Sequence, residues 1–460
     1  MEVYMNKENA YSEYKYFIQT YLLPLLGMPN ENNIEEYHTE REGEGVVHLE
    51  NGYLVFGNYY KNMFRILVHR EVSEDNIKLA INIVLAFFTV SKFRIDAKSK
   101  TSINNHYSSS IQKEAVYKMA VQKGICNWVV GKNSDSVERL MQIIEKWAVQ
   151  TYEGRQVTFA FVINPDIEVS GDDKYGTWFD FIEDDFSAVF TDCINTVIEL
   201  DKNCNFSRYC SITEDNKVSA YELTCETSYR FSNVMQKFVT QNRIGIFLLN
   251  NGDIIISKAG AIRFVKRNLK WLNFSYEAFK NAFWNYAEKE QLQDSLLKEI
   301  FASMLDVSFS HTGGIISVVS DIDKIVTEDQ ILSVSDYLLN GKKDEEIENE
   351  LRENGETREN EIRKRILKRG VIKDFIGERD FMHLDRKLRC ELISLDGACI
   401  LNKQGKICSC GAIIKNDSGS SGGGRGAASK KLSAYGFSIK ISTDGYIELY
   451  IDRELKYAIK

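Results

Sequence analysis

Hydrophobic and polar positions follow two different periods along this chain, and each period predicts one type of element. Apolar side chains recur at helical spacing between Asn76 and Phe93. A second helical stripe follows Asn133 and consists of Val137, Leu140, Met141, Ile144, Trp147 and Ala148. Asp135 and Glu138 have the spacing of a capping box, with Asp135 in the place of the usual Ser or Thr. The pattern therefore predicts two helices in this part of the chain.

Short apolar runs between turn residues predict antiparallel strands. Tyr53–Gly57 and Met63–Val68 form one hairpin-like pair. A second pair, Ile244–Leu249 and Ile254–Ser257, flanks an Asn-Asn-Gly-Asp turn, whose Asn-Gly step accepts the positive φ of a tight hairpin. Further strands are predicted at Val157–Ile163 and Ala261–Lys266. Residues 1–290 are therefore predicted to be α+β with antiparallel hairpins.

The last part of the chain has a different order of elements. A helix is predicted at Leu296–Leu305 and a strand of β-branched residues at Gly314–Val319. Residues 341–369 are dominated by charged side chains, which favours one or two solvated helices. Beyond Phe381 the pattern is strand, loop, helix and strand, and it closes with a hairpin formed by Gly436–Ser442 and Tyr446–Ile451.

This order predicts a multidomain α+β/α/β protein. Its parts are an N-terminal α+β domain of unknown role at 1–130, an α+β domain with antiparallel hairpins at 131–290, and a third domain at 291–460. The third domain is expected to contain a mixed β-sheet flanked by helices, with the segment 341–369 as a charged helical insertion.

Composition and charge narrow the class of protein. A hydrophobic fraction of 43% favours a folded chain, and a formal net charge of −8 argues against a basic surface for nucleic acid. The longest apolar run, Leu79–Val90, is too short for a membrane span of roughly twenty residues. The N-terminal residues do not resemble a signal peptide. We therefore expect a soluble, cytoplasmic protein.

The nine cysteines show no zinc-finger spacing, and reduced thiols fit the cytoplasm. Cys408 and Cys410 lie two apart in a predicted strand and should point to the same face of a sheet as buried, small apolar residues.

Candidate chemistry is concentrated near the end of the chain. A Ser-Leu-Asp-Gly-Ala segment, Ser394–Ala398, is followed by two predicted strands, Ala398–Leu401 and Lys406–Ile414, and then by the glycine-rich run Ser418–Gly426. The run leads into a predicted helix at Ala427–Leu432. A flexible loop that enters a helix N-terminus suits phosphate, and a carboxylate at a strand end suits the accompanying metal. Together they point to a nucleotide.

In order and spacing, these blocks resemble the DAC domain, the diadenylate cyclase domain of DisA-type proteins, which condenses two ATP molecules into cyclic di-AMP. Ser310–Ile316 resembles the family's Thr-Gly-Ala-Leu-Ile strand entry, and Leu384–Asp396 resembles its helix and Asp-Gly-Ala motif. Gly405–Ile414 resembles the following hairpin. Gly422–Ala428 falls where the family carries Gly-Thr-Arg-His-Arg-Thr/Ala-Ala. The resemblance covers residues 295–460.

The resemblance implies a mixed sheet with ATP at its strand ends. Asp396 is expected to hold Mg²⁺ or Mn²⁺ and, with Arg425, to be catalytic if the domain is active. The residues expected to contact the nucleotide are Thr312, Gly313, Gly397, Ala398, Gly422, Gly423, Gly424, Arg425, Gly426 and Lys430. Active family members join two ATP sites across a dimer, so a homo-oligomer is also expected.

One departure from the family determines the functional prediction. Gly424-Arg425-Gly426 replaces Arg-His-Arg, and no histidine occurs after His383. Two flanking guanidinium groups are lost, and phosphoryl transfer depends on positioned charge. We therefore predict a sensor of ATP or a cyclic dinucleotide in second-messenger signalling.

Two alternatives remain open. One is an active diadenylate cyclase or nucleotidyltransferase whose rebuilt loop uses Arg425, Lys430 or Lys431, and the other is a non-catalytic oligomerisation scaffold. In isolation, Asp396 fits a simple turn, Ser418–Gly424 fits a flexible linker and Arg425 fits a solvated surface residue.

Overall fold

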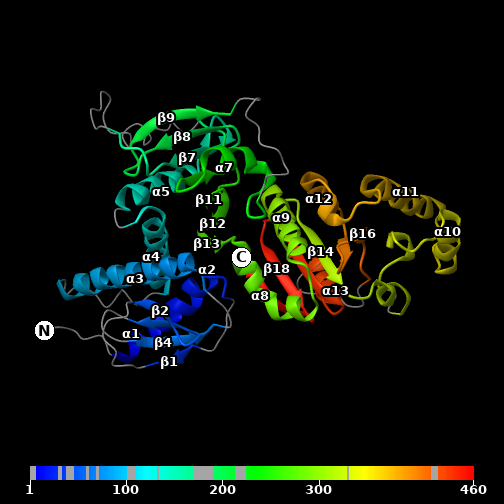
Figure 1. The fold of residues 1–460 in the computed structure, drawn as a ribbon, viewed down its shortest axis with the longest axis horizontal. Helices are drawn as coiled ribbons and strands as arrows, with labels where there is room; N and C mark the ends of the chain where they lie inside the picture. Colours follow the sequence, from blue (N-terminus) through cyan, green and yellow to red (C-terminus); the bar gives the residue numbers. More distant parts are fainter. Residues whose placement is uncertain are drawn as a thin grey trace. The chain divides into compact units, whose positions relative to one another are not determined.

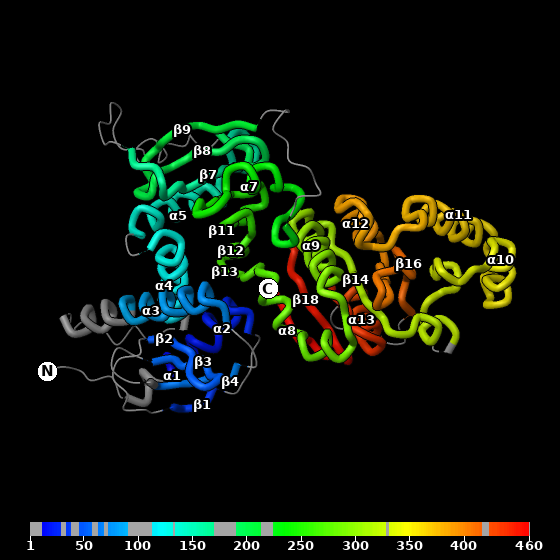
Figure 2. Tube along the Cα trace, viewed as in Figure 1, coloured from blue at the N-terminus to red at the C-terminus, as the bar shows by residue number. Residues whose placement is uncertain are grey.

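A computed structural model of the 460-residue chain forms two compact units (Figures 1 and 2). Unit 1 comprises residues 1–218 and 233–281, and unit 2 comprises 219–232 and 282–460. The structure describes residues 7–28, 34–37, 46–57, 62–68, 72–100, 110–131, 134–169, 190–212, 224–328, 331–415 and 423–459.

Unit 1 contains a small antiparallel sheet with strand order β1-β4-β3-β2. The predicted hairpin is confirmed, since β3 and β4 pair antiparallel with Leu54 opposite Ile66. The predicted helix at Asn76–Phe93 lies within α3. The bounds are β1 Glu35–Glu36, β2 Val47–Glu50, β3 Tyr53–Gly57, β4 Asn62–Leu67, α1 Lys7–Phe17, the π-helical turn η1 Ile18–Leu22, α2 Leu23–Leu25, α3 Glu74–Lys100 and α4 Ser110–Val130.

A larger sheet in unit 1 has the strand order β13-β12-β11-β10-β7-β8-β9. Only β7 and β8 pair parallel among its described strands, and the predicted hairpin of β10 and β11 is confirmed. One continuous apolar core includes residues from both 1–130 and 131–290. The bounds in this stretch of the chain, where η5 belongs to unit 2 and α8 crosses from unit 1 to unit 2, are α5 Asp135–Trp147, β5 Thr151–Tyr152, β6 Arg155–Gln156, β7 Phe159–Ile163, β8 Thr196–Leu200, β9 Phe206–Ser211, η5 Tyr229–Phe231, α7 Ser232–Phe238, β10 Ile244–Leu248, β11 Ile254–Lys258, β12 Ala261–Arg267, β13 Lys270–Asn273 and α8 Tyr276–Lys289.

Helix α5 begins one residue earlier than the capping-box pattern predicts. Ser134, rather than Asp135, is the N-cap, and its hydroxyl donates to Glu138 Oε1 at 2.7 Å. The amide of Glu138 in turn donates to the Ser134 carbonyl. The pattern was misassigned because Ser134 and Asp135 are both good capping residues, and the packing of the apolar stripe decides between them.

Unit 2 is built on a mixed sheet with strand order β16-β15-β14-β17-β18-β19. Strands β14 and β15 pair parallel and the other neighbours pair antiparallel, so the predicted mixed sheet with flanking helices is confirmed. The last strand, β19, was not predicted. The bounds are α9 Asp294–Ser310, β14 Gly314–Val319, η6 Lys324–Glu328, η7 Val334–Asp336, α10 Asp344–Glu353, α11 Glu359–Ile376, η8 Phe381–His383, α12 Arg386–Ile393, β15 Ala398–Asn402, β16 Ile407–Ala412, α13 Gly423–Leu432, β17 Gly436–Ile441, β18 Ile447–Ile451 and β19 Glu454–Ile459.

Helices α12 and α13 cover opposite faces of this sheet. Gly314 lies against the carbonyl of Ile393 in α12, whereas the next residue, Ile315, shares an apolar core with Leu432 of α13. Successive residues of a strand point to opposite faces. The sheet is therefore the middle layer of three.

The charged segment 341–369 forms helix α10 and most of α11, but these helices are not simply solvated. Ile347, Leu351 and Ile362 are buried together with Val334 in a small core of their own. Arg369 is also buried, and its guanidinium donates to the carbonyl of Leu338 and to Asn340 Oδ1. The prediction of solvated helices is therefore wrong for this face.

A buried ion pair between Asp306 and Arg386 binds the backbone of Thr227 and Tyr229, in the segment of unit 2 that precedes α7. Arg386 on α12 donates from Nε and Nη2 to the two carboxylate oxygens of Asp306 on α9, both at 2.9 Å. The same guanidinium donates to the carbonyl of Thr227 at 2.8 Å, and the amide of Tyr229 donates to Asp306 Oδ1 at 2.9 Å. Burial raises the pKa of Asp306 to about 6 in spite of the attraction of Arg386.

Cys408 and Cys410 are buried and free, as predicted, but they point to opposite faces of the sheet. Cys408 packs in the core under α13, whereas the Cys410 Sγ lies 3.6 Å from the Sγ of Cys399. The register between β15 and β16 shifts twice along this stretch, so the strict alternation of a regular strand does not hold. Among the helices that the structure describes, none is long and apolar enough to cross a membrane.

Candidate functional site

Some of the predicted site residues, Thr312, Gly313, Asp396 and Arg425 among them, lie at the end of the unit 2 sheet where β14 and β15 begin, which is called the edge below. Because β14 and β15 run parallel with Ile316 opposite Cys399, both strands begin at this edge. Counting back three residues along each strand brings Gly313 level with Asp396. Strand β17 runs antiparallel to β14, and its last residue, Ile441, lies opposite Gly314. The edge therefore consists of the first residues of β14 and β15 and the last residues of β17.

The connection from α9 to β14 is shaped by backbone conformation. His311 and Gly313 both have positive φ, 55° and 69°, which turns the chain sharply into the strand. The His311 ring Nδ1 lies 3.1 Å from the Thr443 carbonyl oxygen. Ser308 Oγ donates to the carbonyl of Gly445 at 2.6 Å. These contacts attach the end of α9 to the turn between β17 and β18 and hold the edge in place.

Arg425 extends across this edge to Gly313. A Cβ atom at Gly313 would collide with the Arg425 Nη1 atom and would also lie 3.1 Å from the amide nitrogen of Thr443. Only glycine lets the guanidinium lie this close to the backbone at the start of β14. Arg425 is half-buried. The structure brings Gly313 and Arg425 together, as the site prediction requires.

The glycine-rich run does not remain a loop up to Ala427. Helix α13 begins at Gly423, so Gly424, Arg425 and Gly426 lie in its first turn, and Gly422 lies outside the described residues. Gly423 has a φ of 72° and, like Gly424, has open space around it. Gly426 is buried, with the Lys440 Nζ atom 3.9 Å from a Cβ placed on it. The packing of Gly426 stabilises the helix in spite of the low helix propensity of glycine.

Asp396 and its neighbours have different environments. Asp396 is exposed at the start of β15. Gly397 has a φ of 113°, and its backbone packs against that of Gly411 and Ala412, where a side chain would collide. Ala398 is fully buried in the core under α13. Of these three residues, only Asp396 therefore presents a side chain for a ligand.

Thr312 lies at the same edge and belongs to a short hydroxyl chain. Its Oγ1 lies 2.6 Å from the Ser394 Oγ, and the Ser394 hydroxyl donates to the carbonyl of Cys390 at 2.7 Å. Thr312 is exposed beyond this contact. The hydroxyl chain ties the start of β14 to the end of α12.

Three residues near α13 were missed in the sequence: Lys440, Glu448 and Tyr450. Glu448 Oε2 accepts from Lys440 Nζ at 2.9 Å and from the Tyr450 hydroxyl at 2.8 Å. Burial, followed by the charge of Glu448, raises the pKa of the Tyr450 phenol. Lys440 and Glu448 are directly opposite each other on β17 and β18, and the predicted closing hairpin contains the signal that would have paired them.

Two of the predicted lysines lie away from the edge formed by Gly313 and Asp396. The exposed Lys430 has its Nζ 5.9 Å from the centroid of the Tyr450 ring. Lys431 donates to the carbonyl of Lys415 at 2.7 Å. Neither contact brings the ammonium group to Gly313.

Arg425 and Asp396 are the two predicted site residues with charged side chains at this edge. Within the part of the chain that the structure describes, the side chain of neither residue has a hydrogen-bond or ion-pair partner. The nearby cation Lys440 is already paired with Glu448. A half-buried guanidinium without an acidic partner favours an anionic ligand.

Asp396 is the carboxylate that the sequence predicts for a metal ion at this edge. The described residues contain no cluster of three or more His, Cys, Asp or Glu side chains arranged to hold a metal. Mg²⁺ is commonly bound through one or two carboxylates together with substrate phosphates and water. Asp396 therefore fits a metal that arrives with a nucleotide, rather than one held permanently by the protein.

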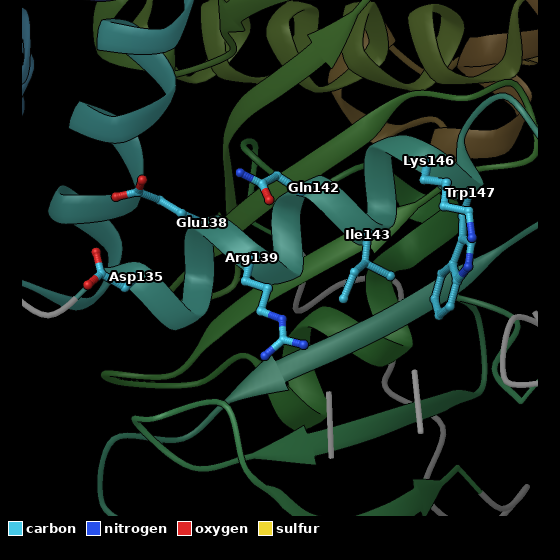
Figure 3. A pocket seen from close by; sticks show the side chains of 7 residues that line it. All are labelled: Asp135, Glu138, Arg139, Gln142, Ile143, Lys146 and Trp147. Atoms are coloured by element: carbon cyan, nitrogen blue, oxygen red, sulfur yellow. The ribbon is translucent and has the colours of Figure 1, made fainter. Parts of the chain in front are cut away.

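A separate cavity lies in unit 1 and contains none of the predicted site residues (Figure 3). It has a volume of about 620 Å³ and is lined by Asp135, Glu138, Arg139, Gln142, Ile143, Lys146 and Trp147. All seven belong to one face of α5. Glu138 is already bound by Lys123 Nζ at 2.9 Å, which identifies it as part of the scaffold.

No protein-family model matches this chain, and no curated protein sequence matches it significantly.

Proposed function

We propose that unit 2 binds a nucleotide, ATP or a cyclic dinucleotide, at the edge where β14 and β15 begin, and that the protein acts as a DAC-like sensor. The observation that carries this proposal is the position of Arg425. Its guanidinium lies against Gly313, half-buried and without an acidic partner among the described residues. Such a group is prepared for a phosphate, which it can bind through two parallel hydrogen bonds.

The start of α13 supports a phosphate in the same place. The first amide groups of a helix have no partner within the helix and point outward from its N-terminus. Here those amides include Gly424 and Arg425, and among the described residues no atom lies within 4 Å of a Cβ placed on Gly424. The backbone amides and the Arg425 guanidinium therefore provide donors to one anion from the same turn.

Asp396 supplies the opposite charge at the neighbouring strand. It is exposed, and it has no ion-pair partner among the described residues. In the proposed complex it binds Mg²⁺ or Mn²⁺, which also coordinates phosphate oxygens and offsets their charge. Thr312 and Gly313 then line the site from β14.

The distribution of charge favours binding over cyclisation. Gly424 and Gly426 stand where the DAC family carries two cationic side chains, and Lys431 is engaged with the carbonyl of Lys415. Phosphoryl transfer depends on fixed charges around the reacting phosphates. A single arginine is sufficient to bind a phosphate but leaves the developing charge of the reaction poorly neutralised. We therefore place this protein among nucleotide-binding sensors, with cyclase activity as the outcome to test.

Ligand-induced stabilisation tests the binding proposal. The full-length protein is titrated with ATP and with cyclic di-AMP, each in Mg²⁺, and the melting temperature is recorded. A ligand that binds only the folded state adds about 2.7 kcal/mol at a concentration one hundred times its Kd. Arg425→Gln should weaken binding at least tenfold, the equivalent of 1.4 kcal/mol. Arg453→Gln, in the turn between β18 and β19, is the matched control and should bind like the wild type.

Asp396→Asn separates the metal from the phosphate contact. We expect this variant to bind ATP with the same affinity in Mg²⁺ and in EDTA, whereas the wild type binds more tightly in Mg²⁺. Asp452→Asn is the control. Incubation with ATP and Mn²⁺, followed by chromatography, should give no cyclic dinucleotide. A product that wild type makes and Asp396→Asn does not would establish a cyclase instead. If no nucleotide stabilises the wild type, the binding proposal is wrong.

A further inference from the structure

Helix α11 carries an apolar stripe on the face that points away from its own core. Leu367 is 66% exposed, Val371 40% and Phe375 55%, and the three residues are spaced at i, i+4 and i+8. This spacing places them on one side of the helix. The opposite side of α11 contributes Ile362 to the small core with α10, and buries Ile372 and Ile376. The helix is therefore apolar on two faces, only one of which is covered.

The exposed stripe lies beyond the β16 edge of the unit 2 sheet, with α10 alongside α11 (Figure 1). It is separate from the proposed nucleotide edge, whose residues come from β14, β15 and α13. Leu367, Val371 and Phe375 form a continuous row over two helical turns, so they make one apolar patch rather than three scattered residues.

The charges at the ends of the stripe indicate what covers it. Lys364 is exposed one turn before Leu367, and Glu378 is exposed just after the helix ends at Ile376. In an antiparallel pair of α11 helices centred on Val371, Leu367 meets the partner's Phe375 and Lys364 meets the partner's Glu378. In a parallel pair, like charges would meet at both ends. The antiparallel direction also sets Arg363 opposite the partner's Arg379, but the Arg379 guanidinium is engaged with the Ile376 carbonyl at 3.0 Å, so this face is more complementary to itself in the antiparallel direction than in the parallel one.

We propose that the α11 stripe is a self-association surface, on which a second copy of this chain docks through an antiparallel, two-fold symmetric contact centred on Val371. The three apolar side chains expose on the order of 300 Å² per copy, which is well below the roughly 800 Å² per partner of a stable interface. The contact therefore belongs to the weak, reversible class. We expect a dissociation constant between about 10 μM and 1 mM.

Single cysteines in the full-length protein test the geometry. Val371→Cys places a thiol on the two-fold axis, so a short bismaleimide should link two copies efficiently. Leu367→Cys and Phe375→Cys should each link poorly alone but efficiently when the two variants are mixed. Glu353→Cys, exposed on α10, is the matched control, and the wild type gives the background of the native cysteines. Efficient linking of Leu367→Cys with itself would indicate a parallel pair and overturn the proposal.

Charge reversal tests the same contact without cross-linking. Sedimentation equilibrium should show that Lys364→Glu and Glu378→Lys each weaken self-association several-fold, and that the double variant restores it to within about twofold, as coupled residues require. Leu367→Lys should abolish the dimer while the nucleotide-induced stabilisation remains. A wild type that stays monomeric at 1 mM, or a double variant weaker than both single variants, contradicts the proposal. Binding of nucleotide by the monomer would leave the function proposed for unit 2 intact.

Discussion

The buried pair of Asp306 and Arg386 gives the sharpest prediction about stability. In Arg386→Met, the carboxylate of Asp306 loses both of its 2.9 Å contacts to the guanidinium and keeps the amide of Tyr229. The side chain of Asp306 is fully buried, so its charge has no access to water. Removal of one partner from a buried ion pair typically costs about 3–5 kcal/mol. We expect a loss of this size in the free energy of unfolding of unit 2 at pH 8.

The loss of stability in Arg386→Met should depend on pH, and the pKa of Asp306 determines in which direction. Burial raises this pKa from 3.8 to about 6 in the wild type, so the folded state binds the proton more tightly than the unfolded state. The contribution of Asp306 to stability is therefore greatest at low pH and declines as the pH rises through 6. Without Arg386 the pKa rises further, by about one for every 1.4 kcal/mol of lost attraction.

At pH 5 the carboxyl of Asp306 is protonated in the folded state of both proteins. The ionic part of the loss then disappears, and about 1–2 kcal/mol remains for the hydrogen bonds to backbone carbonyls. Hydrogen exchange of the α9 amides in increasing urea, at pH 5 and pH 8, measures both values. Asp306→Asn combined with Arg386→Met is the control and should lose the pH dependence. An equal loss at the two pH values would refute the reasoning.

Two further predictions concern the nucleotide edge and the thiols. Gly313→Ala and Gly341→Ala, both at a φ of about 70°, should each bear the backbone cost of about 1–2 kcal/mol. Only Gly313→Ala should also weaken nucleotide binding, because its Cβ displaces the Arg425 guanidinium, whereas Gly341 has open space. In a titration with a chromogenic aryl disulfide, at most two of the nine cysteines should react before unfolding, since only Cys210 and Cys225 are partly exposed. Cys225 should react slowly even so, because burial raises its pKa to about 11 and little of it is thiolate. Rapid reaction of more than two thiols before unfolding would contradict this burial.

Local patterns in the sequence were enough to predict the hairpin of β10 and β11 and the helix α5. An Asn-Gly turn between apolar runs and a continuous apolar stripe each act over a few residues, and nothing in the tertiary structure opposes them. The start of α13 was predicted wrongly for the opposite reason. Gly423–Gly426 have low intrinsic helix propensity, and their helical conformation depends on the packing of Gly426 and Ala427 against the sheet.

In the candidate site, too, local sequence patterns predicted some features, whereas others depend on tertiary packing. Asp396 and Gly313 were found because both stand beside recognisable strand starts. The proximity of Arg425 to Gly313 was expected only through the family resemblance, since 112 positions separate them and their contact depends on the whole sheet. The pair of Lys440 and Glu448 was missed although it lies within one hairpin. The opposite faces of Cys408 and Cys410 depend on two register shifts, which no alternation of residue types reveals.

The discontinuous make-up of unit 2 has a practical consequence for anyone who divides this chain. The chain crosses between the two units three times, at 218/219, 232/233 and 281/282. A fragment that starts at residue 282 retains Asp306 and Arg386 but lacks the Thr227 carbonyl and the Tyr229 amide that bind them. A stretch that looks like a linker is thus part of the fold it precedes. Expression boundaries for unit 2 should include residues 219–232, supplied by circular permutation or as a separate peptide.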